Sequence, residues 1–315
     1  MLQVIQNHLL FFFRQIQSFW FFARAAFAFP VWLPEFLRIT WKYNLYYYNI
    51  FLFMPFFFFS TLKGKRILEV GGSDLPEELL FKKFKATSWT CLDYLDWWTD
   101  PDSSQTKGAV YPLKEASPEL IAQKHVVFNG MIENLPDCFA GQYDSVVSIC
   151  AMEHIPDLPK ALEVIYNALK PGGEFYTCFA PVYSGDKGNH IFVETGPKQK
   201  KVVFNGIPRN GIPRWAHFLV QEKDLREKLL KLYPEEWVNT ICDQCYHSDF
   251  INRKFYDEYI QIFKETPFEN VKILNWFPSY ITPSDKKRLR EVCAPFKSFE
   301  WNGLIIYAKK AKGTK

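Results

Sequence analysis

Strong net charge, paired cysteines and uninterrupted apolar runs are all missing from this sequence. The net charge is only +4 over 315 residues, so no chain-wide positive charge favours a nucleic-acid partner. The seven cysteines are odd in number, which fits buried thiols in a reducing compartment better than a disulfide framework. Arg14 and Arg24 interrupt the first apolar run, and Pro55 interrupts residues 45–60. A membrane span and a signal peptide are therefore not expected, and we expect a cytoplasmic protein.

The first sixty residues are unusually aromatic. They contain 22 of the 57 aromatic residues, and residues 1–65 carry six basic side chains against Glu35 alone. Steps of three and four between apolar positions predict an amphipathic helix. The positions are Ile5, Leu9, Phe13, Ile16, Trp20, Ala23 and Phe27. Two interpretations of residues 1–63 stay open: a helical lid packed on the catalytic domain, or a peripheral membrane contact through residues 1–60 in a bilayer interface.

After Lys65 the pattern alternates between strands and helices. The expected strands are 66–71, 88–93, 125–129, 143–149 and 174–180, with two more in the final fifty residues, and helices are expected at 75–84, 158–169 and near 115–123. This order predicts an α/β fold for residues 64–315, with a doubly wound, mostly parallel, seven-stranded Rossmann-like sheet. An insertion at about 181–246 follows the fifth strand, and a helix capped by Asp249 is expected after it. Ligands of such sheets bind beyond the carboxyl ends of the strands, where the strand order reverses.

The stretch "QYDSVVSICAMEHIPDLPKALEVIYNALKPGGEFY", residues 142–176, contains the most specific motif of the chain. An apolar strand is followed by Glu153-His154, a helix and the run Leu169–Gly173. This arrangement resembles the central signature of class I S-adenosylmethionine-dependent methyltransferases with a type-11-like domain. The resemblance implies S-adenosyl-L-methionine as cofactor and methyl transfer as activity. Gly172 and Gly173 are expected to end the helix in a left-handed turn.

The resemblance also carries the cofactor positions of the family onto the ends of four strands. In the family the first turn lies against the methionine and ribose, and an acidic residue after the second strand accepts the ribose hydroxyls. The positions in this sequence are Glu69, Gly71, Gly72, Ser73, Asp93, Tyr94, Met131, Ile132, Ile149 and Cys150.

Two departures from the family pattern weaken the expected cofactor site. Ser73 and Leu75 replace the second and third glycines of Gly-x-Gly-x-Gly, and a Cβ at Ser73 strains the backbone if φ is positive there. Met131 takes a position where relatives often have an aspartate for the adenine amine. An inactive methyltransferase-fold scaffold at a membrane therefore stays open as a non-enzyme alternative.

Catalytic candidates are the histidines that could deprotonate a hydroxyl acceptor, because a base with a near-neutral pKa assists that step. His154 follows Glu153 after the fourth strand, whereas His190 and His217 lie in the insertion. Glu153 is a further catalytic candidate, expected either to hydrogen-bond the substrate or to orient His154. Which of them is the base, if any, stays open at this point. Arg214 and Arg253 are candidates for holding an anionic acceptor.

The insertion is the expected acceptor cap, since loops on a rigid scaffold commonly determine specificity. The phrases "GNHIF", "PRWAHFL" and "INRKFYDEY" look similar to methyltransferases of bacterial polysaccharide and surface-glycan gene clusters. This similarity implies O-methylation of a small molecule or glycan acceptor, which could be lipid-linked. A quinone or lipid acceptor is the alternative enzyme interpretation, and the oligomeric state stays open. Cys242 and Cys245 have half of a zinc spacing, so we expect plain thiols and no metal site.

Overall fold

The computed structural model describes residues 37, 58, 60–73, 75–95, 109–195, 200–203 and 211–313. The predicted amphipathic helix of the first sixty residues lies outside these ranges, as does the choice between lid and membrane contact. Within the described ranges, no helix combines the length and apolar character needed to cross a membrane.

The described chain forms two compact units. The sheet unit includes the residues up to Phe179, Ile262–Leu274 and the residues from Ile305 onward, and the inserted unit includes Ala180–Gln261 and Asn275–Leu304. Helix α9 (Tyr256–Glu265) and strands β9 (Glu269–Pro278) and β10 (Trp301–Lys309) belong partly to each. Each unit is described by itself below.

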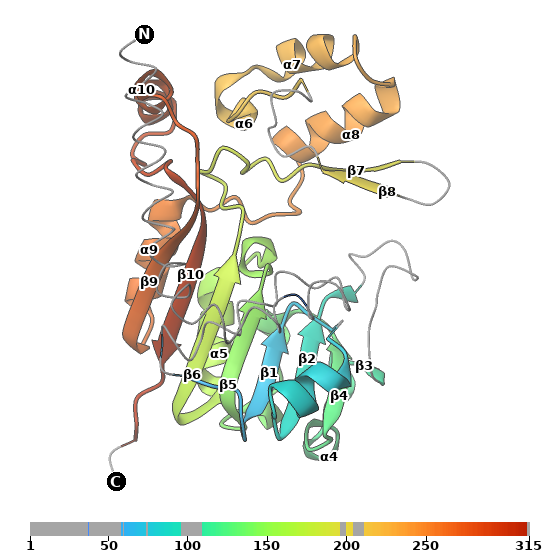
Figure 1. Ribbon diagram of the computed structural model, residues 1–315, viewed down its shortest axis with the longest axis vertical. Helices are drawn as coiled ribbons and strands as arrows, with labels where there is room; N and C mark the ends of the chain where they lie inside the picture. Colours follow the sequence, from blue (N-terminus) through green and yellow to red (C-terminus); the bar gives the residue numbers. More distant parts are fainter. Residues whose placement is uncertain are drawn as a thin grey trace. The chain divides into compact units, whose positions relative to one another are not determined.

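The sheet has eight strands in the order β3-β4-β2-β1-β5-β6-β10-β9 (Figure 1). The other strands are β1 (Arg66–Val70), β2 (Ser88–Asp93), β3 (Val110–Pro112), β4 (His125–Asn129), β5 (Tyr143–Ile149) and β6 (Leu169–Phe179). The pairs from β3 to β6 are all parallel, which confirms the predicted doubly wound, Rossmann-like class. The eighth strand is β3, whose three residues are too short to produce a period-two pattern in the sequence.

The strand order reverses at β1, which lies between β2 and β5. Every residue of β5 except Asp144 is buried, as expected for a parallel strand that is covered on both faces. The reversal places the carboxyl ends of β2, β1 and β5 next to one another, and this is the edge where a ligand site is expected.

The helices of the sheet unit are mostly single turns. They are η2 (Glu78–Lys83, a π-helix), η4 (Leu113–Glu115), α4 (Pro118–Ile121), η5 (Ile132–Asn134), η6 (Asp137–Phe139), η7 (Met152–His154) and the longer α5 (Leu158–Ala168). The side chain of Asp157 caps α5 by accepting a hydrogen bond from the Lys160 amide at 3.0 Å, which satisfies one of the free N–H groups of the first turn.

The predicted glycine end of α5 is wrong. The helix ends at Ala168, Leu169 is already extended, and Gly172 and Gly173 lie within β6. Gly172 does have a left-handed φ of +75°, but its amide donates to the Ala311 carbonyl at 3.1 Å. The β5–β6 register shifts between Tyr143 and Ser145. Gly172 therefore belongs to an irregular part of the β5–β6 pairing and does not cap the helix.

The inserted unit contains a hairpin and several helices. Its elements are β7 (Phe192–Thr195), β8 (Lys200–Val203), α6 (Ala216–Leu219), α7 (Glu222–Leu229), α8 (Glu235–Tyr246), the start of α9 and α10 (Pro283–Val292). Cys242 and Cys245 lie in its main apolar cluster, where burial raises the pKa of both thiols. The sequence interpretation placed the cap of α9 at Asp249, which is wrong because α9 starts at Tyr256. The Glu258 carboxylate there accepts a hydrogen bond from the Phe255 amide at 2.8 Å.

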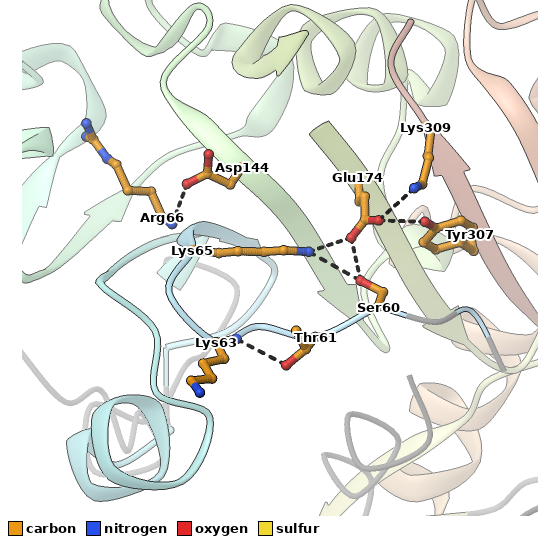
Figure 2. A network of polar contacts seen from close by, with 9 residues as sticks. All are labelled: Ser60, Thr61, Lys63, Lys65, Arg66, Asp144, Glu174, Tyr307 and Lys309. Carbon is orange, nitrogen blue, oxygen red and sulfur yellow. Dashed lines mark hydrogen bonds and ion pairs between the residues drawn. The ribbon is translucent and has the colours of Figure 1, made fainter. Parts of the chain in front are cut away.

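A buried carboxylate ties the segment before β1 to the amino-terminal part of the sheet (Figure 2). Glu174 on β6 accepts hydrogen bonds from Lys65 Nζ at 2.5 Å, from the Ser60 hydroxyl and from the Tyr307 hydroxyl at 2.7 Å, and Lys309 lies 3.1 Å away. Burial raises the pKa of Glu174, but these hydrogen bonds and the Lys65 charge lower it to about 2 overall. The side chain is only 11% exposed, so little solvent screens these contacts.

The depressed pKa predicts a loss of stability in acid. Because the pKa of Glu174 falls from 4.5 to about 2 on folding, its contribution is complete above pH 4.5 and is lost as the pH falls from 4.5 towards 2. Glu174→Gln should lower the free energy of unfolding by about 3 kcal/mol at pH 7 and much less at pH 2.

Denaturant unfolding between pH 2 and pH 7 measures both values. Glu163→Gln is the matched control, because Glu163 is 60% exposed and forms a surface ion pair with Lys160, so it should change stability little at any pH. A Glu174→Gln effect of equal size at both pH values would contradict the proposed role of the carboxylate charge.

Candidate active site

The first two strands place a carboxylate beside a glycine turn. Val70 and Leu92 are register partners on β1 and β2, and the Gly71 amide donates to the Leu92 carbonyl at 2.8 Å. Asp93, the next residue of β2, is half-buried. The turn after β1 and the Asp93 side chain therefore come from neighbouring backbone positions at the same edge of the sheet.

On its other side, the same glycine touches the loop after β5. A Cβ built on Gly71 would lie 2.1 Å from the Ala151 Cβ, and the φ of Gly71 is +75°. Only glycine satisfies both the contact and the left-handed backbone. Gly71 therefore lies at a close contact between the β1 and β5 loops, where the strand order reverses.

The end of β4 completes this edge of the sheet. Asn129 is the register partner of Asp93, its side-chain oxygen accepts a hydrogen bond from the Leu95 amide at 3.0 Å, and the Gly130 amide donates to the Asp93 carbonyl at 2.9 Å. Met131 is half-buried and Ile132 is buried in the following turn. The structure thus brings the predicted cofactor positions together on the ends of four adjacent strands.

Two of these positions have a local chemistry that the sequence did not reveal. Ser73 is buried and is not among the described residues with a positive φ, so the strain foreseen for its Cβ does not arise. Glu69 is 1% exposed, and its carboxylate accepts hydrogen bonds from Trp89 Nε1 at 2.7 Å and from the Cys91 thiol at 3.6 Å. Glu69 therefore fixes β1 against β2 through its side chain.

The backbone turns sharply after β5. Cys150 has a left-handed φ of 54°, and its amide donates to the Cys178 carbonyl at 2.8 Å. Non-glycine residues rarely adopt this conformation, and such strain is concentrated at functional sites. Burial raises the pKa of the Cys150 thiol, which keeps it protonated. The turn η7 then carries Glu153, which is buried, and His154, which is half-buried.

The other two histidine candidates belong to the inserted unit. His217 on α6 donates a hydrogen bond from Nε2 to the Tyr183 carbonyl at 2.9 Å, and burial lowers its pKa to about 4. It is therefore neutral at pH 7 and a weaker base than an ordinary histidine. His190 has a φ of 46° and stacks on Phe250, with 5.7 Å between the ring centroids.

Both arginine candidates are engaged within the inserted unit. Arg214 lies 3.4 Å from the buried Asp186 carboxylate and donates to the Tyr280 carbonyl at 3.2 Å. Arg253 donates to the backbone carbonyls of Tyr246 and Ser248 at 2.6–3.0 Å. These contacts give Arg253 a structural role, since most of its N–H groups already have acceptors.

The contact of Gly71 predicts an unusually costly alanine substitution. Gly71→Ala should lower the free energy of unfolding by about 2–5 kcal/mol, from the left-handed backbone and from the overlap with Ala151. Gly64→Ala is the matched control: its φ is +73°, but no atom lies within 4 Å of the added Cβ, so about 1–2 kcal/mol is expected. Denaturant unfolding measures both variants, and equal losses would mean that the β1 and β5 loops do not meet at Gly71.

The edge formed by these four loops fits S-adenosylmethionine. The Asp93 carboxylate provides two acceptor oxygens for ribose hydroxyls, and the neighbouring turn of two glycines and a serine leaves little side-chain bulk where a ligand would approach. The side chains after β4 and β5 that could surround the rest of the molecule are mainly apolar.

Comparison with known proteins agrees with this geometry. Residues 43–187 match the family model of a methyltransferase domain. A ubiquinone biosynthesis O-methyltransferase of Pseudomonas savastanoi pv. phaseolicola is 24% identical over 151 residues, which are 47% of this chain and 56% of that protein. One from Erwinia tasmaniensis is 33% identical over 69 residues, 19% of this chain and 28% of that protein. The chain thus spans little more than half the length of the first of these relatives.

Solved structures are similar as well. An S-adenosylmethionine-dependent methyltransferase from Mesorhizobium loti is 13% identical, covers 80% of this chain and 93% of its own, and has a TM-score of 0.40. Phosphoethanolamine N-methyltransferase 2 of Haemonchus contortus, in complex with S-adenosyl-L-methionine, is 15% identical and has a TM-score of 0.41. The match covers 86% of this chain and 53% of that protein. Residues 43–187 are thus similar to the methyltransferase domain family, and the four-loop edge lies within this part of the chain.

Proposed function

We propose that the chain is an O-methyltransferase, which transfers the methyl group of S-adenosylmethionine to a hydroxyl of a small-molecule or glycan acceptor. The observation that carries the proposal is the position of Asp93 beside the Gly71 turn, fixed by the Gly71–Leu92 hydrogen bond of 2.8 Å. When bound, the cofactor supplies a methyl group on a positively charged sulfonium.

The residues of this chain would contribute mainly binding and orientation. Asp93 would accept the ribose hydroxyls, and the backbone of residues 71–73 would lie against the ligand. The apolar side chains around Ile132 and Ile149 would exclude water. Positioning of this kind accounts for much of the rate of a displacement reaction. Glu153 and His154, adjacent on η7, are the proposed groups for orienting or deprotonating the acceptor.

The inserted unit is the proposed source of acceptor specificity. A glycan acceptor, which could be lipid-linked, is supported by the resemblance of its phrases to polysaccharide-associated methyltransferases. A quinone acceptor is the second candidate, and the observation that favours it is the name of the curated relatives, ubiquinone biosynthesis O-methyltransferases. Both candidates share the chemistry of a hydroxyl acceptor.

Removal of the Asp93 carboxylate should weaken cofactor binding. Asp93→Ala is expected to raise the Kd for S-adenosylmethionine about 10- to 150-fold, because a hydrogen bond to a charged group contributes about 1.5–3 kcal/mol. Titration calorimetry measures the Kd directly, without knowledge of the acceptor.

Asp137→Ala is the matched control for that titration. Asp137 is an exposed aspartate on η6 of the same unit, and its substitution should leave the Kd unchanged. Equal Kd values for the Asp93→Ala variant and the wild type would mean that the nucleoside binds elsewhere. Absence of binding to the wild-type protein at millimolar cofactor would favour the inactive scaffold.

A further inference from the structure

The side chain of a buried asparagine in the inserted unit is unpaired. Asn189 is 2% exposed, and within the part of the chain that the structure describes neither its side-chain oxygen nor its side-chain nitrogen has a hydrogen-bonding partner. Burial removes both atoms from water, and an unpaired buried amide costs free energy that a folded chain normally avoids. Such a group is retained where something outside the chain completes its hydrogen bonds.

His217 presents a second polar atom of the same kind. Its Nε2 donates to the Tyr183 carbonyl, so the neutral ring has its lone pair on Nδ1. This Nδ1 is buried and has no hydrogen-bonding partner among the described residues. Protonation is disfavoured, since burial lowers the pKa of His217 to about 4. Nδ1 is therefore a fixed acceptor for an O–H or N–H donor.

His217 and Gly188, the residue before Asn189, adjoin the same backbone carbonyl. The Tyr183 oxygen accepts the His217 hydrogen bond at 2.9 Å, and Gly188, the residue before Asn189, approaches it so closely that a Cβ would lie 2.0 Å from that oxygen. The Gly188 and His190 amides donate to the Gly185 and Lys187 carbonyls, both at 3.1 Å. These bonds fix the backbone on both sides of Asn189.

Asn302 shows that this unit can satisfy a buried asparagine. It is 1% exposed, its Nδ2 donates to Asp186 Oδ1 at 2.7 Å, and its Oδ1 accepts from the Lys187 amide at 3.1 Å. Asn302 and Asn189 thus have the same side chain and similar burial in the same unit. Only Asn189 keeps both ends of its amide available.

We propose that Asn189 and the Nδ1 atom of His217 bind an uncharged hydroxyl group of the acceptor. This assignment rests on the proposed function and specifies its substrate class. The Asn189 amide can both donate to and accept from a hydroxyl, and His217 Nδ1 can accept its proton in a hydrogen bond. A carboxylate or phosphate is disfavoured, because neither residue carries a positive charge and the guanidinium of Arg253 already donates to backbone carbonyls.

Stability measurements test whether the Asn189 amide is unpaired. Asn189→Leu and Asn189→Ala should leave the melting temperature of the full-length protein unchanged or raise it, because no hydrogen bond is lost. Asn302→Leu and Asn302→Ala, the matched controls, should lower it by about 4 °C or more, since Asp186 loses a buried donor. If the melting temperatures of both Asn189 variants fell as far as those of the Asn302 variants, the Asn189 amide would have a structural partner and the proposal would fail.

Two hydroxyl probes test the ligand, catechol as a phenol and methyl β-D-glucopyranoside as a sugar. Saturation-transfer NMR at tens of millimolar probe should show binding to the wild type that is at least fivefold weaker in Asn189→Ala. Equal signals from the two proteins, including no signal from either, would overturn the assignment. Calorimetry with S-adenosylmethionine on the same samples separates the hypotheses: the cofactor should bind both proteins equally. If the wild-type protein bound the hydroxyl probes but not S-adenosylmethionine, the result would contradict the proposed methyltransferase function and not the assignment of Asn189.

Discussion

The contact between Gly71 and Ala151 is the constraint on which the candidate cofactor site depends. Because Gly71 has no Cβ, the β1 turn can lie against the loop after β5, and the Gly71 amide can still reach the Leu92 carbonyl on β2. One residue therefore fixes the spacing of three neighbouring strand ends. Asp93 occupies its position beside the turn as a consequence, since its backbone immediately follows that hydrogen bond.

The two ends of the strands are stabilised in different ways. At the amino-terminal part of the sheet, Glu174 gathers Lys65, Ser60, Tyr307 and Lys309 into one polar network (Figure 2). The carboxyl edge has less favourable local structure, including the left-handed Cys150 after β5. Strain of this kind persists only where the surrounding structure holds it in place. Compact polar packing at one end of the strands therefore coexists with a strained backbone at the other.

Much of the sheet could be predicted from the sequence, because buried parallel strands appear as short apolar runs between turn residues. The bounds of β2, β4 and β5 agree with the prediction. Several local features were wrong or missed for identifiable reasons. β3 is too short for a pattern, and the glycines after α5 look like a helix end although they form an irregularity of β6. The Asp249 cap failed because Glu258, further along the chain, satisfies the start of α9. Only for the glycines is the deciding partner distant in sequence, since the Gly172 amide donates to the Ala311 carbonyl.

The site residues were predictable to the extent that their role follows from position along a strand. Gly71 and Asp93 became candidates in this way, whereas Asn189 did not, because no sequence pattern distinguishes it from Asn302. The difference between the two asparagines lies in what surrounds them: Asp186 and Lys187 complete the amide of Asn302, and no described residue completes that of Asn189. A natural sequence is expected to satisfy its local structural rules except where function requires otherwise. By that criterion the unpaired Asn189 amide and the left-handed backbone of Cys150 support the same conclusion. Each lowers the stability of the folded chain, and each lies where we infer that a ligand binds.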